Sequence, residues 1–321
     1  MAALSKDAMD DSHLAAPLAS LHGERPAAPE WFSRALRREP SRRFVDVDGA
    51  KIETLIWEPA EAATKPALLL LHGNGAHADW WSFIAPFLVR ERRVAALSWS
   101  GMGRSDWRPT YSRPVFEREA VEVARATELN ENGPPILVAH SFGGRVALSL
   151  AATHSERFRA AVVVDPPIFT PDRPKPPGPG DREFRPHRIY PTFAEAMARF
   201  RFAPPQTCAN LFIADHIARG SLREEPNGEG WTWRFDPFLW RGMTLEDADA
   251  AVRAAKLPVA LIRGGVSALM RAEDAAYVMS LLPDGSPYVE IPEADHHVMV
   301  DQPLAFIAGL EALLATWPGA S

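Results

Sequence analysis

Short runs of apolar residues, each bounded by polar or turn-forming residues, recur along most of the chain. They occupy residues 67–72, 93–98, 135–140, 160–164, 257–263 and 287–291. Because these runs are continuous and do not alternate with polar residues, they favour strands that are buried on both faces of a parallel sheet. Helical patterns separate them at 79–90, 115–130, 143–154, 270–282 and 303–316. Alternating strands and helices predict right-handed crossovers and a doubly wound α/β sheet.

Residues 44–58 follow a different pattern, in which two short strand-like runs flank the pair Asp48-Gly49. An Asp-Gly pair at such a place is typical of a tight hairpin turn. The hairpin would add an antiparallel edge, so we expect a mixed but mostly parallel sheet. Within an N-terminal part over 1–40, residues 1–28 predict a poorly ordered arm and residues 31–38 a short helix.

The regular alternation is interrupted between the fourth and fifth of the buried runs. Nine prolines in the 26 residues of 166–191 are too many for a helix or a central strand, so this stretch predicts a loop. The rest of the interruption is rich in aromatic residues, which favours a packed insertion over a disordered linker. We therefore expect a helical cap at 167–256 on a core formed by 41–166 and 257–321. Its tryptophans would line a substrate pocket, or merely close the core: Trp231, Trp233 and Trp240.

Composition and charge narrow the class of protein. Hydrophobic residues make up 46% and charged residues 24%, as in ordinary globular chains. The net charge of −6 comes without a basic stripe, so we expect neither a nucleic acid nor an anionic membrane as partner. No segment approaches the roughly 20 apolar residues that span a bilayer, and residues 1–30 contain no secretion signal.

The single cysteine, Cys208, excludes an intramolecular disulfide and a CxxC metal site, and it fits a reducing compartment. These features predict a cytoplasmic protein. No cluster of His, Cys and Asp has the spacing of metal ligands, so neither a metal nor an organic cofactor is expected. The oligomeric state stays open, a homodimer included.

The strongest chemical signal is AHSFGG at 139–144, which directly follows a predicted buried strand and directly precedes a predicted helix. A serine in a tight strand-to-helix turn projects its hydroxyl from the carboxyl edge of the sheet, where a nucleophile has to be. The residues two places before and after it, Ala139 and Gly143, must be small because the turn brings them close together. Ser141 is therefore the predicted nucleophile; the alternative is that it only caps the helix.

A nucleophilic serine needs donors for the oxyanion that its attack creates. The backbone amide of Phe142 is one candidate, because it begins the helix after the serine. HGNG at 72–75 follows the first buried run, and its glycines allow the backbone to approach a substrate closely. The amide of Asn74 would be the second donor and Gly75 would border the substrate pocket, unless the segment is a plain glycine turn.

The serine also needs a base, and histidine has the appropriate pKa. Residues 291–303 follow the last predicted strand and contain both His296 and His297. His296 lies seven residues before Pro303, at the spacing of a base on the loop after a final strand, so it is the predicted general base. His297 is predicted to lie in the adjacent pocket.

Together these motifs resemble the α/β-hydrolase superfamily over about residues 43–318. HGNG at 72–75, AHSFGG at 139–144 and ADHHVMVDQP at 294–303 carry the resemblance, and SWSGMGRS at 98–105 supports it. Each motif is weak by itself, but together they are specific for the fold. The resemblance implies an α/β-hydrolase fold, with a doubly wound and mostly parallel sheet and a helical cap insertion, and a serine hydrolase.

Two positions depart from the pattern of this family. Ser98 stands where members usually carry an Asp that concerns loop structure. The acid that orients the histidine commonly follows the penultimate strand in a stretch like GGxSD, but residues 264–268 read GGVSA, with Ala268 in place of the carboxylate. Haloalkane dehalogenases and zearalenone-type lactonases place the acid after the strand that follows the nucleophile helix, where this chain has Asp165.

Asp165 is therefore the predicted acid of the triad. It lies 24 residues after the serine, at the end of a predicted buried strand, and it preserves the order Ser, Asp, His. It can equally cap the turn that follows. Glu273 and Asp274 fit the start of a helix better, and Asp295 is too close to the base in sequence to orient its ring. That Ala268 replaces a native Asp also stays open.

The predicted function is hydrolysis of a carboxylic ester or lactone through a Ser141–His296–Asp165 triad and an acyl-enzyme. Because the cap is aromatic, we expect a substrate with an apolar or aromatic portion. A zearalenone-type lactonase, a C–C hydrolase and an acyltransferase or perhydrolase stay open within the enzyme class. Outside that class, the missing acid at Ala268 leaves a ligand-binding pseudo-hydrolase as an alternative.

Overall fold

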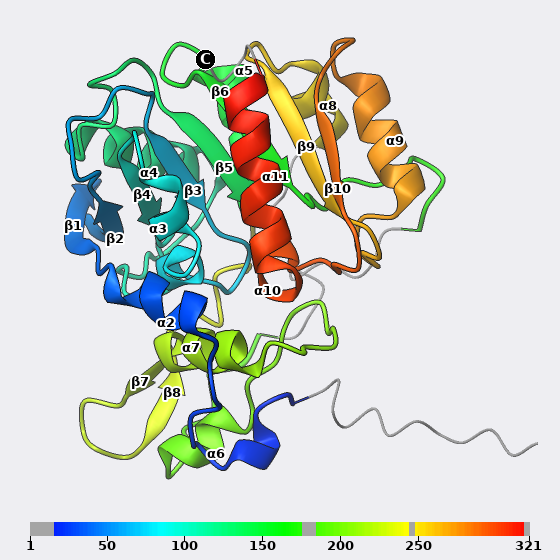
Figure 1. The fold of residues 1–321 in the computed structure, drawn as a ribbon. Coiled ribbons are helices and arrows are strands. Elements are labelled where there is room, and N and C mark those ends of the chain that lie inside the picture. Colours follow the sequence, from blue (N-terminus) through cyan, green and yellow to red (C-terminus); the bar gives the residue numbers. More distant parts are fainter. Residues whose placement is uncertain (1–15, 175–183, 244–247, 318–321) are drawn as a thin grey trace, which may run out of the picture.

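A computed structural model describes residues 16–174, 184–243 and 248–317, with an eight-stranded sheet at its centre (Figure 1). The strand order is β1-β2-β4-β3-β5-β6-β9-β10. β2 runs antiparallel to β1 and β4, and the strands from β4 to β10 are parallel, which confirms the predicted mixed and mostly parallel sheet. The strands are β1 (Ser41–Val47), β2 (Ala50–Trp57), β3 (Leu68–Leu71), β4 (Val94–Leu97), β5 (Ile136–His140), β6 (Ala160–Val164), β9 (Val259–Gly264) and β10 (Tyr288–Ile291).

β1 and β2 form the predicted hairpin, in which Val47 pairs with Ala50. The two residues between them, Asp48 and Gly49, have φ values of 50° and 77°. Positive φ at both central positions is the geometry of a type I′ turn, and its twist matches that of the strands it joins. The Asp-Gly pair therefore fixes the antiparallel edge of the sheet.

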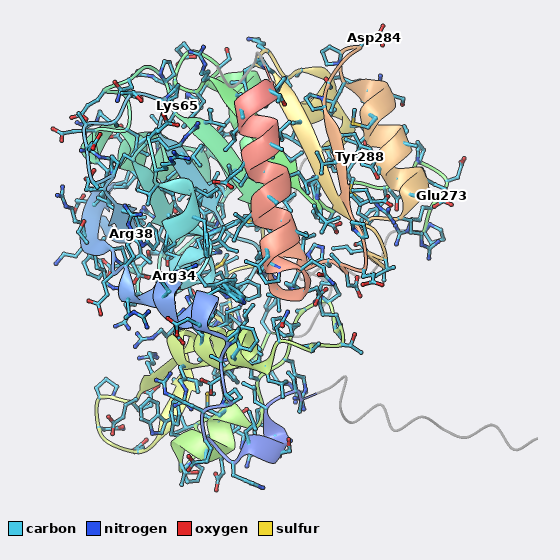
Figure 2. The ribbon with its side chains drawn as sticks, in the orientation of Figure 1. Arg34, Arg38, Lys65, Glu273, Asp284 and Tyr288 are labelled. Carbon is cyan, nitrogen blue, oxygen red and sulfur yellow. The ribbon has the colours of Figure 1, made fainter. Side chains whose placement is uncertain are left out.

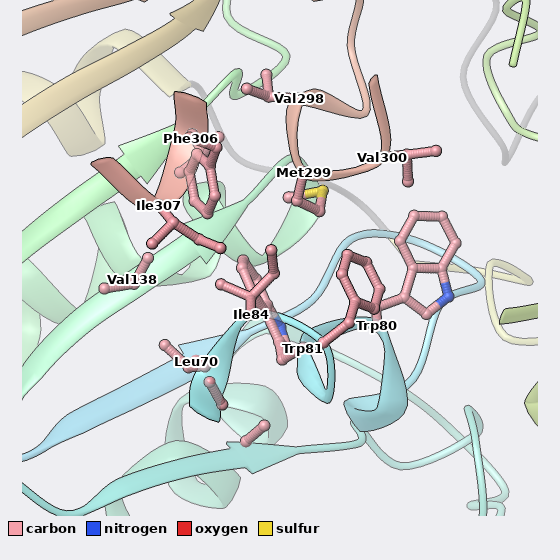
Figure 3. Packing of buried hydrophobic residues seen from close by; sticks show 14 of the residues in the cluster. Leu70, Trp80, Trp81, Ile84, Val138, Val298, Met299, Val300, Phe306 and Ile307 are labelled. Carbon is pink, nitrogen blue, oxygen red and sulfur yellow. The ribbon is translucent and has the colours of Figure 1, made fainter. Parts of the chain in front are cut away.

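Successive residues of the central strands bury themselves on opposite faces of the sheet. In β3, Leu68 and Leu70 belong to one apolar cluster, whereas Leu69 and Leu71 belong to the other. This is the two-residue period of a strand with both faces covered. Figure 3 shows the first cluster, where Leu70 and Val138 face Ile84, directly before α3 (Ala85–Leu88), and Phe306 and Ile307 of α11 (Pro303–Thr316).

Helices cover the sheet in two layers, as Figure 1 shows. The face of Leu70 is covered by α3 (Ala85–Leu88), α10 (Val298–Asp301) and α11 (Pro303–Thr316). The opposite face is covered by α4 (Arg113–Ala126), α5 (Phe142–Thr153), α8 (Ala248–Arg253) and α9 (Ala272–Leu281).

The helix predicted at 79–90 is divided into the 3₁₀ helix η2 (Ala78–Trp81) and α3. Pro86 explains the division. Proline has no N–H and fits only the first turn of a helix, so a new helix begins at Ala85.

Residues 167–256, which we call the cap segment, connect β6 to β9. Its described elements α6 (Phe193–Met197), α7 (Leu211–Ser221), β7 (Leu222–Glu224) and β8 (Trp231–Trp233) lie together beyond the end of the sheet that carries α10 (Figure 1). α8, the last helix of the segment, lies instead against α5 and α9, and its Val252 joins the core on that face. The segment therefore ends beside the sheet and not on the lobe formed by α6, α7, β7 and β8.

The N-terminal residues that the structure describes pack against this lobe. Leu18 is 1% exposed before η1 (Ala19–Leu21), and the guanidinium of Arg219 on α7 donates to the carbonyl of Gly23. The predicted short helix is present as α2 (Glu30–Arg37). Residues 16–28 are thus an ordered strap and not the poorly ordered arm that their local pattern predicts, because their apolar side chains bury against distant cap helices. Residues 1–15 of that predicted arm lie outside the described residues.

No helix within the three described ranges has both the length and the apolar character needed to cross a membrane.

Candidate active site

The site lies where the chain changes direction across the sheet. β3 pairs with β4 on one side and with β5 on the other, so the connections after β3 and β5 leave the sheet on opposite faces. In open α/β sheets such a switch point opens a crevice at the carboxyl ends of the strands, where ligands bind. Gly73 and Asn74 follow β3 at this point, and Ser141 follows β5.

Ser141 occupies a strained turn between β5 and α5, with φ 54° and ψ −119°. The surrounding glycines are required by close packing of the backbone. A Cβ on Gly143 would lie 2.7 Å from the carbonyl oxygen of His72, and one on Gly73 would lie 3.1 Å from the Cβ of Ser141. The small residues predicted around the serine therefore allow the loops after β3 and β5 to touch.

The structure brings Ser141, His296 and Asp165 into one chain of hydrogen bonds. His296 Nε2 lies 2.9 Å from Ser141 Oγ, and His296 Nδ1 lies 2.8 Å from Asp165 Oδ1. A carboxylate only accepts hydrogen bonds, so Nδ1 carries the proton and Nε2 is free to accept the serine proton. All three side chains are buried. This arrangement can deprotonate a serine hydroxyl.

The carboxylate of Asp165 also accepts hydrogen bonds from the end of β9 and from the loop that follows it. Its Oδ1 accepts a hydrogen bond from Ser267 Oγ at 2.8 Å, and its Oδ2 accepts one from the amide of Gly264 at 3.0 Å. With His296, these donors fix the carboxylate. Ala268 is exposed, and its amide donates to Asp295.

None of the other candidate acids contacts the ring of His296 among the described residues. Glu273 is exposed at the start of α9, on the side of the molecule (Figure 2). Asp274 accepts hydrogen bonds from the amides of Thr170 and Arg271. Asp295 accepts one from the amide of His296 at 2.7 Å and so holds the backbone of the base, not its ring.

Neutral histidines surround the ring of His296. His140 and His297 are buried at ring-centroid distances of 4.8 and 4.9 Å from it. Burial lowers the pKa of both well below its usual value, and the neighbouring His296 lowers it further. His140 Nε2 lies 2.9 Å from the carbonyl of His296 and donates to it. The backbone of the base is thus held at both its amide and its carbonyl.

The two amides predicted to hold an oxyanion belong to Asn74 and Phe142. Neither donates a hydrogen bond to another residue of the described chain. Phe142 is the first residue of α5, where amides have no partner within the helix and the helix dipole favours negative charge. Both amides are therefore available as donors.

Two spaces that share lining residues open beside these residues. A space of about 10 Å³, enough for about one water molecule, is bordered by Ser141, His296 and Asn74. A cavity of about 350 Å³ is bordered by Asn74, Gly75, His297 and Trp240. Its lining also includes aromatic rings from η2 and the cap segment: Trp80, Phe184, Phe200, Phe202 and Phe235.

The three tryptophans that the sequence placed in the pocket have different positions. Trp240 borders the large cavity, but Trp231 and Trp233 are not among its lining residues. They lie on β8, where Trp231 packs on Phe193 and Trp233 on Tyr190 inside the cap lobe. The expectation for these two residues thus differs from the structure, because a period-two pattern alone does not tell which face of β8 meets the cavity.

Local sequence patterns missed a buried carboxylate that supports the loop after β4. Glu53, on β2, is fully buried and accepts a hydrogen bond from Ser98 Oγ at 2.7 Å and one from the amide of Arg104 at 2.9 Å. Ser98 Oγ in turn accepts from the amide of Ala78 at 2.9 Å. Glu53 therefore provides the carboxylate that the family usually has at position 98. The signal for it is a lone Glu within the apolar run of β2.

Gln206, in the cap segment, is a second residue that the sequence did not indicate. Its Oε1 accepts hydrogen bonds from the amide and from Nδ1 of His297, and its Nε2 donates to Asp301 at 2.9 Å. The cap segment is thereby bound to the loop that carries His296. No group of three His, Cys, Asp or Glu residues in the described part of the chain could hold a metal ion.

Comparison with known proteins agrees with this fold. A family model for the alpha/beta hydrolase fold matches residues 66–303, so the chain belongs to the α/β-hydrolase family. It is a hydrolase of that type.

Similar proteins act as lipases, esterases and other hydrolases. (Lyso)-N-acylphosphatidylethanolamine lipase of Mus musculus is 28% identical over 297 residues, which cover 82% of this chain and 83% of that protein. Esterase Rv0045c of Mycobacterium tuberculosis is 27% identical over 290 residues, covering 84% and 88%. 2-Hydroxymuconate semialdehyde hydrolase of Pseudomonas sp. strain CF600 is 39% identical, but over only 103 residues, or 30% of this chain and 35% of that protein.

Solved structures show the same fold at low sequence identity. Esterase Rv0045c covers 98% of this chain with a TM-score of 0.63 at 22% identity, and 100% of that structure is matched. The thioesterase domain from the curacin biosynthetic pathway covers 86% of this chain and is itself matched over 99%, with a TM-score of 0.67 at 22% identity.

Proposed function

We propose that the protein is a serine hydrolase that cleaves a carboxylic ester or lactone with an apolar or aromatic portion. The observation that carries this proposal is the chain of hydrogen bonds from Asp165 through His296 to Ser141. It ends beside a space that also contacts Asn74, one of the two available amides. A nucleophile, its base and an oxyanion donor thus converge on one place.

The reaction would proceed in two steps. His296 Nε2 takes the proton of Ser141 as Oγ attacks the carbonyl carbon, and the amides of Asn74 and Phe142 donate to the oxyanion. The tetrahedral intermediate collapses as His296 returns the proton to the leaving alcohol, which leaves an acyl-enzyme. Water then attacks the acyl carbon and gives a proton to His296, which passes it to Ser141 Oγ as the bond from Oγ to the acyl carbon breaks and the acid leaves.

The lining of the large cavity supports the expected substrate. Six Phe and Trp rings line it together with a few charged side chains, such as Arg185 and Asp236, and its volume of about 350 Å³ is within the range of pockets for small organic molecules. Several relatives are named as lipases or esterases, which supports an ester bond over other acyl bonds.

Labelling with a fluorophosphonate tests this proposal directly. We expect the folded protein to react stoichiometrically, and Ser141→Ala to abolish both the label and the hydrolysis of p-nitrophenyl esters. A panel of esters and lactones then separates an esterase from a lactonase. The lactonase is favoured by the position of Asp165, which resembles that of the acid in zearalenone-type lactonases. If the wild-type protein has a folded circular-dichroism spectrum but takes no label, the protein is a ligand-binding pseudo-hydrolase.

C–C bond hydrolysis is the second candidate. It is favoured by the identity of 39% to 2-hydroxymuconate semialdehyde hydrolase, although over 103 residues only. This candidate predicts turnover of 2-hydroxymuconate semialdehyde with a kcat/KM above that of every ester in the panel. The opposite ranking supports the ester hydrolase.

A further inference from the structure

The cap segment is hydrogen-bonded to the loop after β3 at two places, at His77 through α7 and at Asn74 through Trp240. Trp240 Nε1 donates to the side-chain Oδ1 of Asn74 at 2.9 Å, across 166 positions of sequence. Asn74 is the residue whose amide would hold the oxyanion. We infer that Trp240 is a positioning residue that holds the oxyanion hole in its active geometry, an inference that rests on the proposed serine hydrolase.

Trp240 contacts the residues of both proposed donors. Besides its bond to Asn74, its ring packs edge-on against the ring of Phe142, with a centroid distance of 5.3 Å and an interplanar angle of 79°. The two donors come from different loops, one after β3 and the other after β5. A side chain that contacts both residues therefore fixes their relative positions.

The loop of Asn74 needs such an external contact. It is flanked by Gly73 and Gly75, and Gly75 has a φ of 68° with no atom near the place of a Cβ. Gly73 is packed against Ser141, but Gly75 leaves the backbone after Asn74 free to change conformation. Among the described residues, the side chain of Asn74 makes one hydrogen bond, and Trp240 is its donor. The orientation of the Asn74 amide thus depends on the cap segment.

Trp240 is itself fixed to the core through Asp236. The amide of Asp236 donates to the carbonyl of Gly101 at 2.7 Å, and its Oδ2 accepts from the hydroxyl of Tyr111 at 2.7 Å. Asp236 and Leu239 are both buried, at 8% and 1% exposure. The short turn that carries Trp240 therefore connects the loop after β4 to the loop after β3.

This role differs in its kinetics from that of a wall of the substrate cavity. An oxyanion donor acts on the transition state, and losing one costs about 10²–10³ in kcat. A displaced donor costs part of that, so Trp240→Phe should lower kcat about 10- to 50-fold and change KM less than about threefold. Loss of a cavity wall would instead raise KM, and more for bulky esters than for small ones.

The experiment measures kcat and KM of Trp240→Phe on p-nitrophenyl acetate and on a bulky aryl ester, together with the rate of fluorophosphonate labelling. The phosphonyl oxygen uses the same donors, so the labelling rate should fall by the same factor as kcat on both esters. Trp107→Phe is the matched control, because the exposed indole of Trp107 also donates to a carbonyl, that of Arg234. It should stay within twofold of wild type.

Asn74→Ala tests the same contact from the other side, since it removes the acceptor but keeps the amide. It also serves if Trp240→Phe does not fold. The inference expects the double variant to be no slower than either single variant. Additive losses, a change in KM alone, or a kcat of both single variants within twofold of wild type would overturn it. Wild-type protein that takes no label refutes the proposed function instead, so the two failures are distinguishable.

Discussion

β6 and β9 are neighbouring strands of the sheet, and the loops that follow them have different roles at the carboxylate of Asp165. The loop after β6 begins with Asp165, which is fully buried and reaches His296. The loop after β9 contains the stretch where family members commonly carry the acid, yet it presents an exposed Ala268. Instead, Ser267 of this loop and Gly264 at the end of β9 donate hydrogen bonds to Asp165.

This difference teaches that the ring of His296 needs a carboxylate at a certain position in space, whichever segment of the chain supplies it. Because β6 and β9 are parallel neighbours, their carboxyl ends meet at the same edge of the sheet. Either loop can therefore approach the same histidine ring, and the other loop can become its support.

Removing the carboxylate after β6 should have the largest effect. Asp165→Asn keeps the shape of the side chain but no longer fixes the tautomer of His296, so we expect kcat to fall by up to ~10⁴. Steady-state kinetics on a p-nitrophenyl ester measures the loss, and Glu273→Gln, at the exposed start of α9, should show none. Near-normal turnover of Asp165→Asn would show that Asp165 only caps its turn.

The buried rings of His140 and His297 should remain uncharged in the folded protein, so that Asp165 is the charged group beside His296. Unfolding measured at a series of pH values can test this expectation. The pKa values of His140 and His297 are lowered in the folded protein, so below pH 6.5 the unfolded chain binds protons that the folded chain does not. The free energy of unfolding should therefore fall as the pH decreases below 6.5.

Asp301 acts in the opposite direction and offsets part of this loss. Burial raises its pKa to about 6, so its contribution to stability is present at low pH and is lost as the pH rises through 6. Urea unfolding at pH 7 and pH 5 measures the sum. His297→Phe should reduce the loss between the two pH values, while His72 and His216, whose pKa values burial also lowers, still contribute to it. An unchanged loss would mean that His297 is charged in the folded protein.

Removing one support after β9 should have a smaller effect. Ser267→Ala deletes one of three hydrogen bonds to Asp165 while the bonds from Gly264 and His296 remain. A hydrogen bond to a charged group contributes about 1.5–3 kcal/mol, of which part orients the carboxylate, so we expect kcat to fall about tenfold. Ser280→Ala, on the exposed face of α9, is the control. A loss as large as that of Asp165→Asn would contradict this division of roles.

Restoring an acid after β9 should have almost no effect. Position 268 is exposed, so a carboxylate placed there by Ala268→Asp faces solvent and not the ring of His296. We expect that variant to retain kcat within threefold, and the double variant Asp165→Asn with Ala268→Asp to remain as slow as Asp165→Asn. Recovery of more than tenfold in the double variant would show that this loop can supply the acid and that Ala268 has replaced a native Asp.

Most of the sheet and the core of the site could be predicted from local patterns. Continuous apolar runs mark strands with two buried faces, and Asp48-Gly49 marks the hairpin, because each depends on neighbours within a few residues. The exceptions depend on distant contacts. Residues 16–28 are ordered because Leu18 is buried and Arg219 of α7 binds the carbonyl of Gly23, and α8 leaves the cap lobe because Val252 has a place beside α5.

By itself the sequence determined the turn at Ser141, the glycines around it and the histidine after the last strand, since each is defined by a strand that ends and a loop that follows. Tertiary structure decided which carboxylate meets that histidine, 131 positions away, and which of three tryptophans reaches Asn74. The physical reason is that a hydrogen bond of 2.8 or 2.9 Å depends on how strands and cap are packed together, and no local pattern encodes a distance between segments so far apart.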